Sequence, residues 1–468
     1  MVNSKRARSG KPRIQPRGST YIEPRGVSQG LERVREAAKR DASLCFTNLL
    51  HHITEQLLRK AYKALNSKAA PGVDDVTWAE YGEGLENRLK DLHGRVHRGS
   101  YRAQPSLRTY IPKSDGRMRP LGIAAVEDKI VQQAVVWVLQ VIYEEDFLGF
   151  SYGFRPGRSQ HNALDAVWEA IMQRKVNWVL DADIHGFFDF IDHGWMMKFV
   201  EHRIGDQRVL RLIRKWLTAG VSEDGLWSST VVGTPQGATI SPLLANIYLH
   251  YVLDLWVEAW QKRHAQGEVY IVRYADDFLM GFQYRDDAEA FHHMLGERMQ
   301  KFGLELNTEK TRLLEFGRFA RDNRAKRGEG KPETFEFLGF THICARRRKD
   351  GGFVVQRKTI AKRLRMKVKE VTKELKRRRH DPVSEQGRWV CSVVRGYFNY
   401  HAVPGNIYAL GRFREQIARA WLRALRRRSQ KGRGLTWVRM QRLLDTWLPR
   451  PRILHPYPNQ RLRVTNLR

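Results

Sequence analysis

The chain has 468 residues, of which 42% are hydrophobic, and its 83 Lys and Arg against 50 Asp and Glu give a formal charge of +33. Such a charge indicates a polyanionic partner, and the length exceeds that of one hydrophobic core, so we expect at least two packed units. Three distant cysteines, and the lack of any apolar run of roughly 18 residues, exclude a disulfide scaffold, a Cys-pair zinc module and a membrane helix.

The first 40 residues hold 11 basic and 3 acidic side chains, for a net charge of +8. Pro, Gly, Arg and Ser are frequent at the start, so we expect residues 1–30 to be a basic disordered arm. This arm either contacts nucleic acid or only keeps the chain in solution. Helical spacing of Leu and Ile follows from Leu31 to Leu65, and turn-forming residues occupy 70–75.

Residues 41–340 are nearly neutral, with 38 basic and 40 acidic side chains, and alternate between helical and strand patterns. The Asp115-Gly116 pair indicates a hairpin turn, and Ser159 is a typical helix cap. The predicted elements are strands at 107–111 and 118–123, helices at 126–146 and 159–174, a strand at 178–184, a helix at 195–218, and strands at 269–273 and 278–282.

Residues 341–468 hold 34 basic and 7 acidic side chains, for a net charge of +27. Apolar residues recur at helical spacing from Ile360 to Leu375 and from Phe413 to Leu425, with Lys and Arg on the other faces. We therefore expect an all-helical basic tail that packs by one face and presents cations to a nucleic-acid backbone with the other.

Three carboxylates stand out in the middle of the chain: Asp183 follows an apolar strand, and Asp276 and Asp277 are adjacent in a tight turn. Like charges so close are unfavourable unless a cation neutralises them, and hard cations such as Mg²⁺ prefer carboxylate oxygens. Two such ions can activate an attacking hydroxyl and stabilise the leaving oxygen of a phosphoryl transfer. An Asp-Asp pair alone is more typical of an exposed hairpin turn, so the neighbouring motifs decide between the two interpretations.

Further motifs share the middle of the chain with these acids. In chain order they are Arg155-Pro156-Gly157-Arg158, Gly233-Thr234-Pro235-Gln236-Gly237-Ala238, Ser241-Pro242-Leu243-Leu244-Ala245-Asn246, Tyr274-Ala275-Asp276-Asp277 and Phe302-Gly303-Leu304-Glu305-Leu306-Asn307. Together they resemble the fingers and palm of a reverse transcriptase. The flanks, with residues 70–78 and Gly396 to His401, extend the likeness over nearly the whole chain to the group II intron-encoded reverse transcriptases, which carry a maturase region.

This resemblance implies an α+β fold, a right-hand polymerase with fingers and palm followed by an all-α basic thumb and maturase region. It divides the chain into residues 1–30, the basic disordered arm; 31–100, an N-terminal helical extension of the fingers; 101–340, the reverse transcriptase fingers and palm; 341–430, the helical thumb and maturase (X) domain; and 431–468, a C-terminal basic segment that contacts DNA or RNA.

The resemblance also implies roles for single residues. Asp183, Asp276 and Asp277 are the expected catalytic residues, and they are the expected ligands of two Mg²⁺ ions. Lys113 and Arg119 are expected to grip the incoming triphosphate from the hairpin, where a point charge and a forked guanidinium neutralise phosphate oxygens in different geometries. The residues alone also allow two solvated hairpin charges.

Three more residues are expected to contact the incoming deoxynucleotide. Phe188 is the expected steric gate against a ribose 2′-OH, Gln236 is expected near the nascent base pair, and Lys310 is expected on a phosphate. The alternatives are a core aromatic at Phe188 and an ordinary surface lysine at Lys310. Asp181 and Asp189 flank the site and are not expected to be ligands.

Two arginine runs of the tail, Arg377-Arg378-Arg379 and Arg426-Arg427-Arg428, are expected to contact RNA. The expected function is RNA-directed DNA polymerase activity, joined to maturase binding of a structured group II intron RNA that assists splicing and mobility. The expected partners are that RNA, an RNA template with a DNA primer, dNTPs and a target DNA, with no membrane. A cytoplasmic, nucleoid-associated ribonucleoprotein is the expected location.

Two other functions stay open at this point, a non-enzymatic factor that folds intron RNA and a domesticated reverse transcriptase of a defence system. A pure binder has no use for three clustered acids, which favours the enzyme. The likeness also predicts a type that lacks the endonuclease, because no Cys-pair and His-Asn-His type nuclease module follows the tail. We then expect no cleavage of the second DNA strand and a primer made by another process, such as replication.

Overall fold

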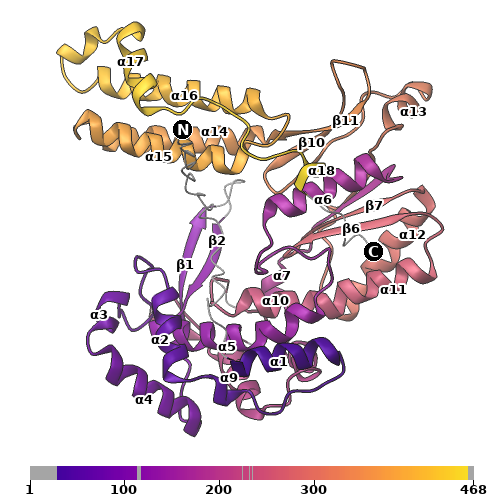
Figure 1. The fold of residues 1–468 in the computed structure, drawn as a ribbon, viewed down its shortest axis with the longest axis vertical. Helices are drawn as coiled ribbons and strands as arrows, with labels where there is room; N and C mark the ends of the chain where they lie inside the picture. The colour runs from indigo at the N-terminus through magenta and orange to yellow at the C-terminus, as the bar shows by residue number, and fades with distance from the viewer. Residues whose placement is uncertain (1–28, 113–117, 224, 231, 235, 462–468) are drawn as a thin grey trace, which may run out of the picture.

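The computed structural model describes residues 29–112, 118–223, 225–230, 232–234 and 236–461. It is an α+β fold, as expected, in which three sheets lie among helices (Figure 1). The predicted arm at 1–30 falls almost wholly outside these ranges. Within them, none of the helices combines the length and the apolar character that crossing a membrane requires.

The N-terminal region is helical, but the spacing between Leu31 and Leu65 does not form one continuous helix. Asp206, far along the chain, accepts hydrogen bonds from the backbone N–H groups of Leu49 at 2.8 Å and Leu50 at 3.0 Å, which holds this stretch out of a helix. Thr54 then caps the next helix. The elements are α1 (Gln29–Arg40), η1 (Leu50–His52), α2 (Glu55–Ala64), α3 (Trp78–Gly82) and α4 (Leu85–Arg98).

The predicted hairpin is confirmed as β1 (Ser106–Pro112) and β2 (Met118–Ile123), which pair antiparallel from Leu107 opposite Ile123 to Pro112 opposite Met118. Its connection, with Lys113, lies outside the described residues. Two short strands, β4 (Val221–Glu223) and β5 (Leu226–Ser228), extend the sheet in the order β2-β1-β4-β5, with β4 parallel to β1.

The central sheet has the order β6-β7-β3-β8 and contains the two predicted strands that flank the Asp-Asp turn. Its strands are β3 (Trp178–Ala182), β6 (Val269–Tyr274), β7 (Asp277–Phe282) and β8 (Arg312–Glu315). The helices predicted at 126–146 and 159–174 are confirmed, and Ser159 forms a capping box. The helices around this sheet are α5 (Val126–Asp146), α6 (Gln160–Gln173), α10 (Ser241–Leu249), the π-turn η2 (His250–Asp254), α11 (Leu255–Arg263) and α12 (Arg285–Lys301).

The single helix predicted at 195–218 is wrong. A one-turn helix α7 (Phe187–Phe190) precedes two helices, α8 (His193–Glu201) and α9 (Gln207–Thr218). The break follows from Asp206, whose side chain accepts from the N–H of Arg208 and caps α9 while it also holds the N-terminal region. The apolar residues keep a helical spacing across the break, and only Gly205 and the helix-capping Asp206 indicate it in the sequence.

The prediction of an all-helical region from residue 341 is also wrong. After α13 (Ala320–Lys326), residues 335–359 form a third sheet of β9 (Phe335–Phe337), β10 (Phe340–Arg346) and β11 (Phe353–Thr359), in the order β11-β10-β9. Arg357 of β11 is buried in an ion pair with Asp165 of α6 at 3.0 Å. The local sequence also carried a signal for these strands, because Asp350-Gly351 in the connection is typical of a hairpin turn and Phe353-Val354-Val355 favours a strand.

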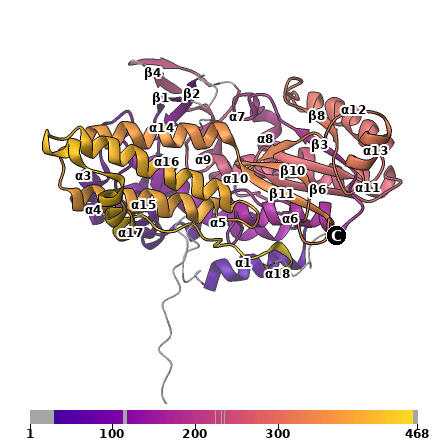
Figure 2. The same cartoon turned by 90° about the horizontal axis from the view of Figure 1, so that it is seen from above.

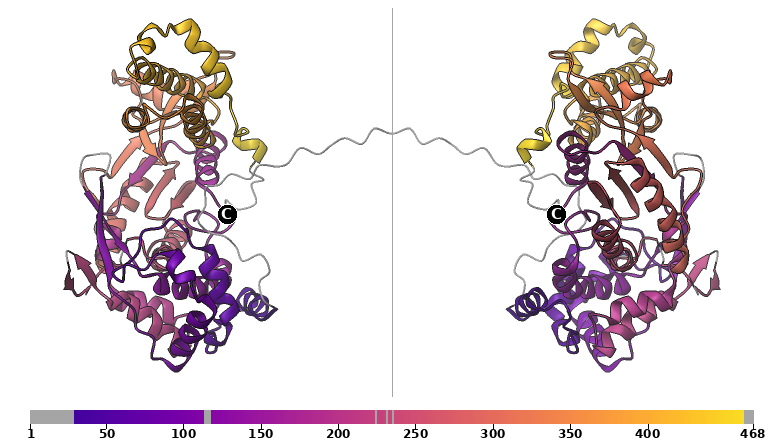
Figure 3. Two further views of the ribbon diagram at one scale, coloured as in Figure 1. Left: turned by 90° about the vertical axis from the view of Figure 1, so that its left-hand side faces the viewer. Right: turned by 90° about the vertical axis from the view of Figure 1, so that its right-hand side faces the viewer.

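From residue 361 the tail is helical as predicted, and Figure 2 shows its three long helices lying side by side. The chain then returns: Leu454 and His455 donate backbone hydrogen bonds to the carbonyl of Ala402, and the last helix lies against α6 (Figure 3). The elements are α14 (Ala361–Arg377), α15 (Val383–His401), α16 (Ile407–Arg426), η3 (Lys431–Gly434), α17 (Trp437–Trp447) and α18 (Pro458–Arg461).

Three hydrophobic cores hold the described chain together, which agrees with the expectation of at least two packed units. The largest joins the N-terminal helices to one face of the central sheet through Leu180 and Met280. The opposite face, with Val179 and Leu279, packs on α6 and the third sheet, and α14–α17 enclose a core of their own. The central sheet is therefore buried on both faces, and its functional groups lie at its strand ends.

Three histidines lie beside these cores, His250 and His342 buried and His401 half-buried, and burial favours their neutral form. Burial lowers the pKa of His342 to about 3, of His250 to about 4 and of His401 to about 4. Neither ring nitrogen of His342 has a hydrogen-bond partner in the part of the chain that the structure describes, and its ring stacks on Phe335 at 4.6 Å. Each histidine has a lower pKa in the folded chain than in the unfolded chain, so acid favours unfolding.

We expect the contribution of these histidines to the unfolding free energy to be fully retained above about pH 6.5 and to fall as the pH decreases toward 4, by about 1.4 kcal/mol per pH unit for each histidine. The raised pKa values of Asp181 and Asp277 act in the opposite direction, so the comparison with a histidine variant isolates the effect. Urea titrations at pH 7, 6 and 5 measure this slope. His342→Phe keeps a flat ring on Phe335. It should reduce the slope of unfolding free energy against pH by the contribution of one titrating group, about 1.4 kcal/mol per pH unit. His293→Gln is the control, because the His293 side chain is 80% exposed; equal slopes for wild type and His342→Phe would contradict the assignment.

Candidate active site and nucleic-acid interface

The Tyr274-Ala275-Asp276-Asp277 segment forms a tight hairpin between β6 and β7. Tyr274 pairs with Asp277, which leaves a two-residue turn whose first residue, Ala275, has φ of +59°. Such a conformation costs an L-residue roughly 1–2 kcal/mol. The protein around the turn must therefore hold it, and the direction in which Asp276 and Asp277 point depends on those contacts.

The strand register brings Asp183 to the same place. β3 lies between β7 and β8, with its last residue Ala182 opposite Phe278, so Asp183 follows next to Asp277. The backbone carbonyl of Asp183 accepts from Asn307 N–H at 2.7 Å, and its Oδ2 lies 2.7 Å from Lys310 Nζ. Three of the predicted site residues and Lys310 are thus neighbours at one end of the central sheet.

The three carboxylates repel one another. Desolvation by the surrounding protein, then the charges of Asp276 and Asp183, raise the pKa of Asp277 to about 7. Its side chain is exposed to solvent, and the charges of the two neighbouring carboxylates oppose its ionisation directly. Burial, opposed by a backbone hydrogen bond, also raises the pKa of Asp276, with Asp183 adding to the rise.

Hard oxygen donors with unrelieved negative charge fit a divalent cation. Within the described residues, however, no three Asp, Glu, His or Cys side chains converge as a metal centre, and Asp183 is paired with Lys310 instead. The donor set therefore fits Mg²⁺ in its chemistry, and the three carboxylates lie at one end of the sheet without converging on one point. Asp181 faces Arg312 at 3.8 Å and has a pKa raised to about 6 by burial, with the nearby charge of Arg312 opposing the rise.

A cavity of about 260 Å³ lies between the β1–β2 hairpin and the loop before α10. Phe188, Asp189 and Gln236 all line it. Two backbone contacts close it: Thr234 N–H donates to the Phe188 carbonyl at 2.8 Å, and Gly122 N–H donates to the Gln236 carbonyl at 2.6 Å. The structure thus places Phe188 and Gln236 at the same cavity. Phe188 also packs edge-on against the buried ring of Phe187.

Arg119 lies on β2, opposite Ile111, and is exposed. Its charge opposes the rise of the Asp276 pKa, so its side chain is close enough to interact with that carboxylate. Its expected companion Lys113 lies outside the described residues. Arg363 of α14 acts on Asp277 in the same way and lines a second cavity of about 450 Å³ with Tyr397 and Tyr400.

Sequence reasoning missed four buried residues behind the turn: Arg273, Asp254, Asn246 and Gly153. A signal was present for one of them, because Arg273 interrupts the apolar strand Val269-Tyr270-Ile271-Val272. A charge in such a strand needs a buried partner. Nothing in the local sequence identifies that partner.

Comparison with known proteins agrees with this geometry. Residues 111–342 match the family model "Reverse transcriptase (RNA-dependent DNA polymerase)". Protein YkfC of Escherichia coli K12 is 37% identical over 289 residues, which are 54% of this chain and 75% of YkfC. The group II intron-encoded protein LtrA of Lactococcus lactis is 37% identical over 234 residues. The chain belongs to the group II intron-type reverse transcriptases.

Coverage differs among these relatives. The match to LtrA spans 48% of this chain but 38% of LtrA. Nuclear intron maturase 2 of Arabidopsis thaliana is 28% identical over 176 residues, or 29% of this chain and 24% of that protein. The family model includes all three carboxylates as well as Phe188 and Gln236 of the 260 Å³ cavity, so the matched region of this reverse transcriptase is the region in which the site lies.

The side chains of the two arginine runs of this reverse transcriptase make different contacts. Arg377 and Arg378 both pair with Glu374 at 2.6 Å. Arg426 donates to the Leu435 carbonyl at 2.8 Å, and Arg428 donates to the carbonyls of Asp381 and His380. These contacts join the end of α16 to the α14–α15 turn and to η3, so the guanidinium groups of Arg426 and Arg428 stabilise the helical region.

Arg379 and Arg427 differ from these residues. Arg379 Nε is buried without a partner in the described part of the chain. Arg427 is exposed, and the described residues supply its side chain with no hydrogen bond or ion pair. Of the second run, Arg427 is therefore the residue best placed for a phosphate.

Arg427→Gln and Arg428→Gln should separate RNA contact from stability. We expect Arg427→Gln to lower the log–log salt slope of RNA binding by about 0.7 to 0.9 and to leave thermal unfolding unchanged. Arg428→Gln should instead lower the unfolding free energy by about 1–2 kcal/mol, because it loses two hydrogen bonds from a charged group. Filter binding from 50 to 300 mM salt and urea titration measure the two effects, and identical effects of both substitutions would contradict this division.

Proposed function

We propose that this reverse transcriptase synthesises DNA on an RNA template and also binds a structured group II intron RNA as a maturase. The observation that carries the polymerase activity is the β3–β7 register, which places Asp183 beside the Asp276-Asp277 turn. We assign 31–100 to a helical extension of the fingers, 101–340 to fingers and palm, 341–430 to thumb and maturase, and 431–468 to a segment that contacts DNA or RNA. The third sheet spans the boundary at residue 340 in this assignment, with β9 before it and β11 after it.

Asp183, Asp276 and Asp277 would hold two Mg²⁺ ions. Bound there, the ions would supply Lewis acidity for the primer 3′-hydroxyl and for the leaving phosphate oxygen. The ammonium of Lys310 would exchange its ion pair with Asp183 for one with a phosphate of the substrate, because it can pair with either anion. Arg119, with Lys113, would neutralise the triphosphate of the dNTP, while Phe188 and Gln236 would bound the sugar and the nascent base pair.

The binding of intron RNA and target DNA is supported by charge and by family. Residues 341–468 carry +27, and their long helices expose Lys and Arg beside an apolar core. LtrA and the Arabidopsis maturase are both named as intron proteins. We infer the same class of RNA here, in a nucleoid-associated cytoplasmic ribonucleoprotein.

A non-enzymatic RNA-folding factor and a defence-system enzyme have less support. A binder needs no acid cluster in which desolvation and then the neighbouring carboxylates raise the pKa of Asp277. The similar proteins whose names state a role are named for introns. The intron polymerase therefore remains the best-supported function.

The catalytic proposal predicts that Asp276→Asn will reduce primer extension on RNA by at least ~10³-fold, which corresponds to about 4 kcal/mol of transition-state stabilisation. RNA affinity should stay within a few-fold, because the substitution keeps the size of the side chain. Single-turnover extension and filter binding measure the two quantities. Near-normal extension by the variant would show that Asp276 is no metal ligand.

The gate proposal predicts that Phe188→Ala will increase incorporation of ribonucleotides far more than it reduces incorporation of deoxynucleotides. The removed ring opens the wall of the 260 Å³ cavity without touching the carboxylates. Single-nucleotide extension with dNTPs and with NTPs gives the ratio. An equal loss with both substrates would identify Phe188 as a core residue instead. Its edge-on contact with Phe187 is the observation that supports this alternative.

A further inference from the structure

Arg273 is fully buried directly behind the Asp276-Asp277 turn. Its Nε donates to Asp254 Oδ1 at 2.7 Å and its Nη2 to Asp254 Oδ2 at 2.5 Å, and both side chains are 0% exposed. A forked pair of this kind fixes the guanidinium plane. The remaining donor of the fork, Nη1, can then point in only one direction.

That donor reaches the turn itself. Arg273 Nη1 donates to the backbone carbonyl of Ala275 at 3.0 Å and to Asn246 Oδ1 at 3.0 Å. Ala275 is the residue with φ of +59°, immediately before Asp276. The hydrogen bond therefore acts on the one peptide group of the turn whose conformation is strained.

The partner of Arg273 sits in an irregular part of its helix. Asp254 is the last residue of the π-turn His250–Asp254, which lies between α10 and α11. A π-turn adds one residue to the helical turn and shifts the side chains that follow, and such turns are frequent at functional sites. Here its last residue, Asp254, pairs with Arg273, while Asn246 on the preceding helix holds the same guanidinium.

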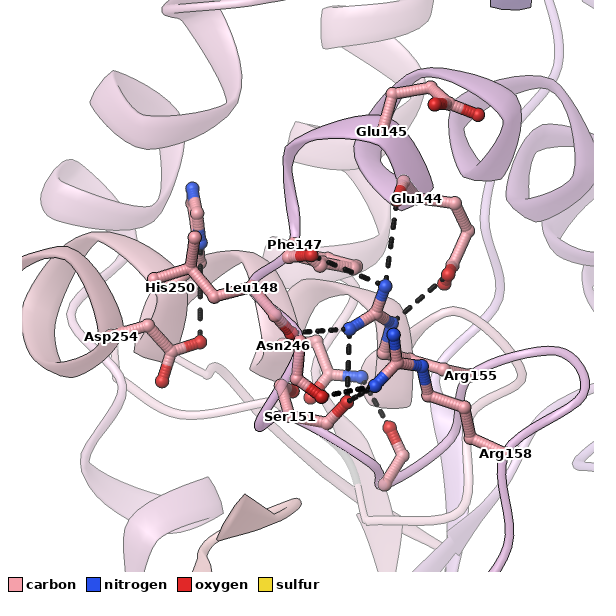
Figure 4. Close-up of polar contacts among 12 residues, drawn as sticks. Glu144, Glu145, Phe147, Leu148, Ser151, Arg155, Arg158, Asn246, His250 and Asp254 are labelled. Carbon is pink, nitrogen blue, oxygen red and sulfur yellow. Dashed lines mark hydrogen bonds and ion pairs between the residues drawn. The ribbon is translucent and has the colours of Figure 1, made fainter. Parts of the chain in front are cut away.

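A loop packs against the turn from the other side. Asn246 Nδ2 donates to the Gly153 carbonyl at 2.8 Å, and a Cβ on Gly153 would lie 2.2 Å from Ala275 N. Only glycine fits at this approach. Figure 4 shows how Arg155 secures the loop, with hydrogen bonds to the carbonyls of Leu148 and Ser151 and an ion pair with Glu144 at 3.0 Å.

We propose that Arg273 is a positioning residue of the polymerase site. Held by Asp254 in the π-turn, its guanidinium fixes the Ala275 peptide against Gly153, and this aims the carboxylates of Asp276 and Asp277 at the place where Asp183 lies. The inference rests on the proposed function of the three carboxylates. It assigns the π-turn, Asn246 and Gly153 to the same task.

A buried arginine elsewhere in the chain separates positioning from plain stability. Arg203 is 1% exposed, pairs with Asp146 at 2.8 Å and donates to the carbonyls of Asp41 and Leu44, far from the turn. Lysine in place of either arginine keeps the charge but loses the fork. Both variants should lose thermal stability, and only the one beside the turn should lose metal binding.

The experiment compares Arg273→Lys with Arg203→Lys in the full chain. We expect Arg273→Lys to raise the half-saturating Mg²⁺ concentration of primer extension about 10-fold and to lower kcat about 10²-fold, with the KM for primer–template within 3-fold. Arg203→Lys should keep all three within 3-fold. Mn²⁺ titration followed by electron paramagnetic resonance should show about 10-fold weaker binding for Arg273→Lys alone.

A second pair of variants keeps the test decisive if Arg273→Lys does not fold. Gly153→Ala leaves the charge pair intact and should weaken Mn²⁺ binding and kcat in the same way. Gly296→Ala is its control, because a Cβ there meets nothing within 4 Å. Wild-type metal dependence in Arg273→Lys or Gly153→Ala, or an equal loss in Arg203→Lys, would overturn the inference.

The Mn²⁺ titration also separates this inference from the proposed function. A wild-type protein that binds Mn²⁺ but extends no primer on RNA would refute the polymerase. The positioning role would still be decided by whether Arg273→Lys and Gly153→Ala weaken Mn²⁺ binding relative to their controls.

Discussion

Three carboxylates repel one another at one end of the central sheet, and the structure must keep them together at a cost. The cost appears as the raised pKa values of Asp276 and Asp277, which result first from desolvation and then from the neighbouring carboxylates. It is opposed by the β3–β7 register and by hydrophobic cores on both faces of the sheet, which prevent the strands from sliding apart. Cations from other elements, Arg119, Lys310 and Arg363, supply the nearby positive charge.

The strongly basic composition has two uses in this molecule. Some guanidinium groups stabilise the fold. Those of Arg273, Arg203 and Arg357 are buried in ion pairs with aspartates, and that of Arg428 donates to a backbone carbonyl of the α14–α15 turn. Others, such as Arg427, are exposed. Net charge therefore predicts a nucleic-acid partner for the tail, while the contacts of each arginine decide whether its removal affects binding or stability.

Local patterns predicted much of the fold. The strand pair at 107–111 and 118–123, the helix cap at Ser159 and the helix at 126–146 all depend on residues that are close in sequence, and all three have the expected structure. The break in the helix predicted at 195–218 and the strands within 340–359 combine local and distant contacts. Asp206 caps α9 and also binds the N-terminal region, while β10 pairs with β11 and Arg357 pairs with Asp165, so the local signals were present but weaker than the helical periodicity and the basic composition around them.

The sequence by itself determined the acids of the candidate site, the family to which they belong and the basic character of the tail, because these follow from residue type and motif order. Only the tertiary structure decided what holds the Asp276-Asp277 turn in place. Arg273, Asp254, Asn246 and Gly153 come from separate elements and meet only when α10, the π-turn and the 147–153 loop pack behind β6. A buried arginine requires an anionic partner, but the local sequence does not show which of the 50 acidic residues will pair with it in the folded chain.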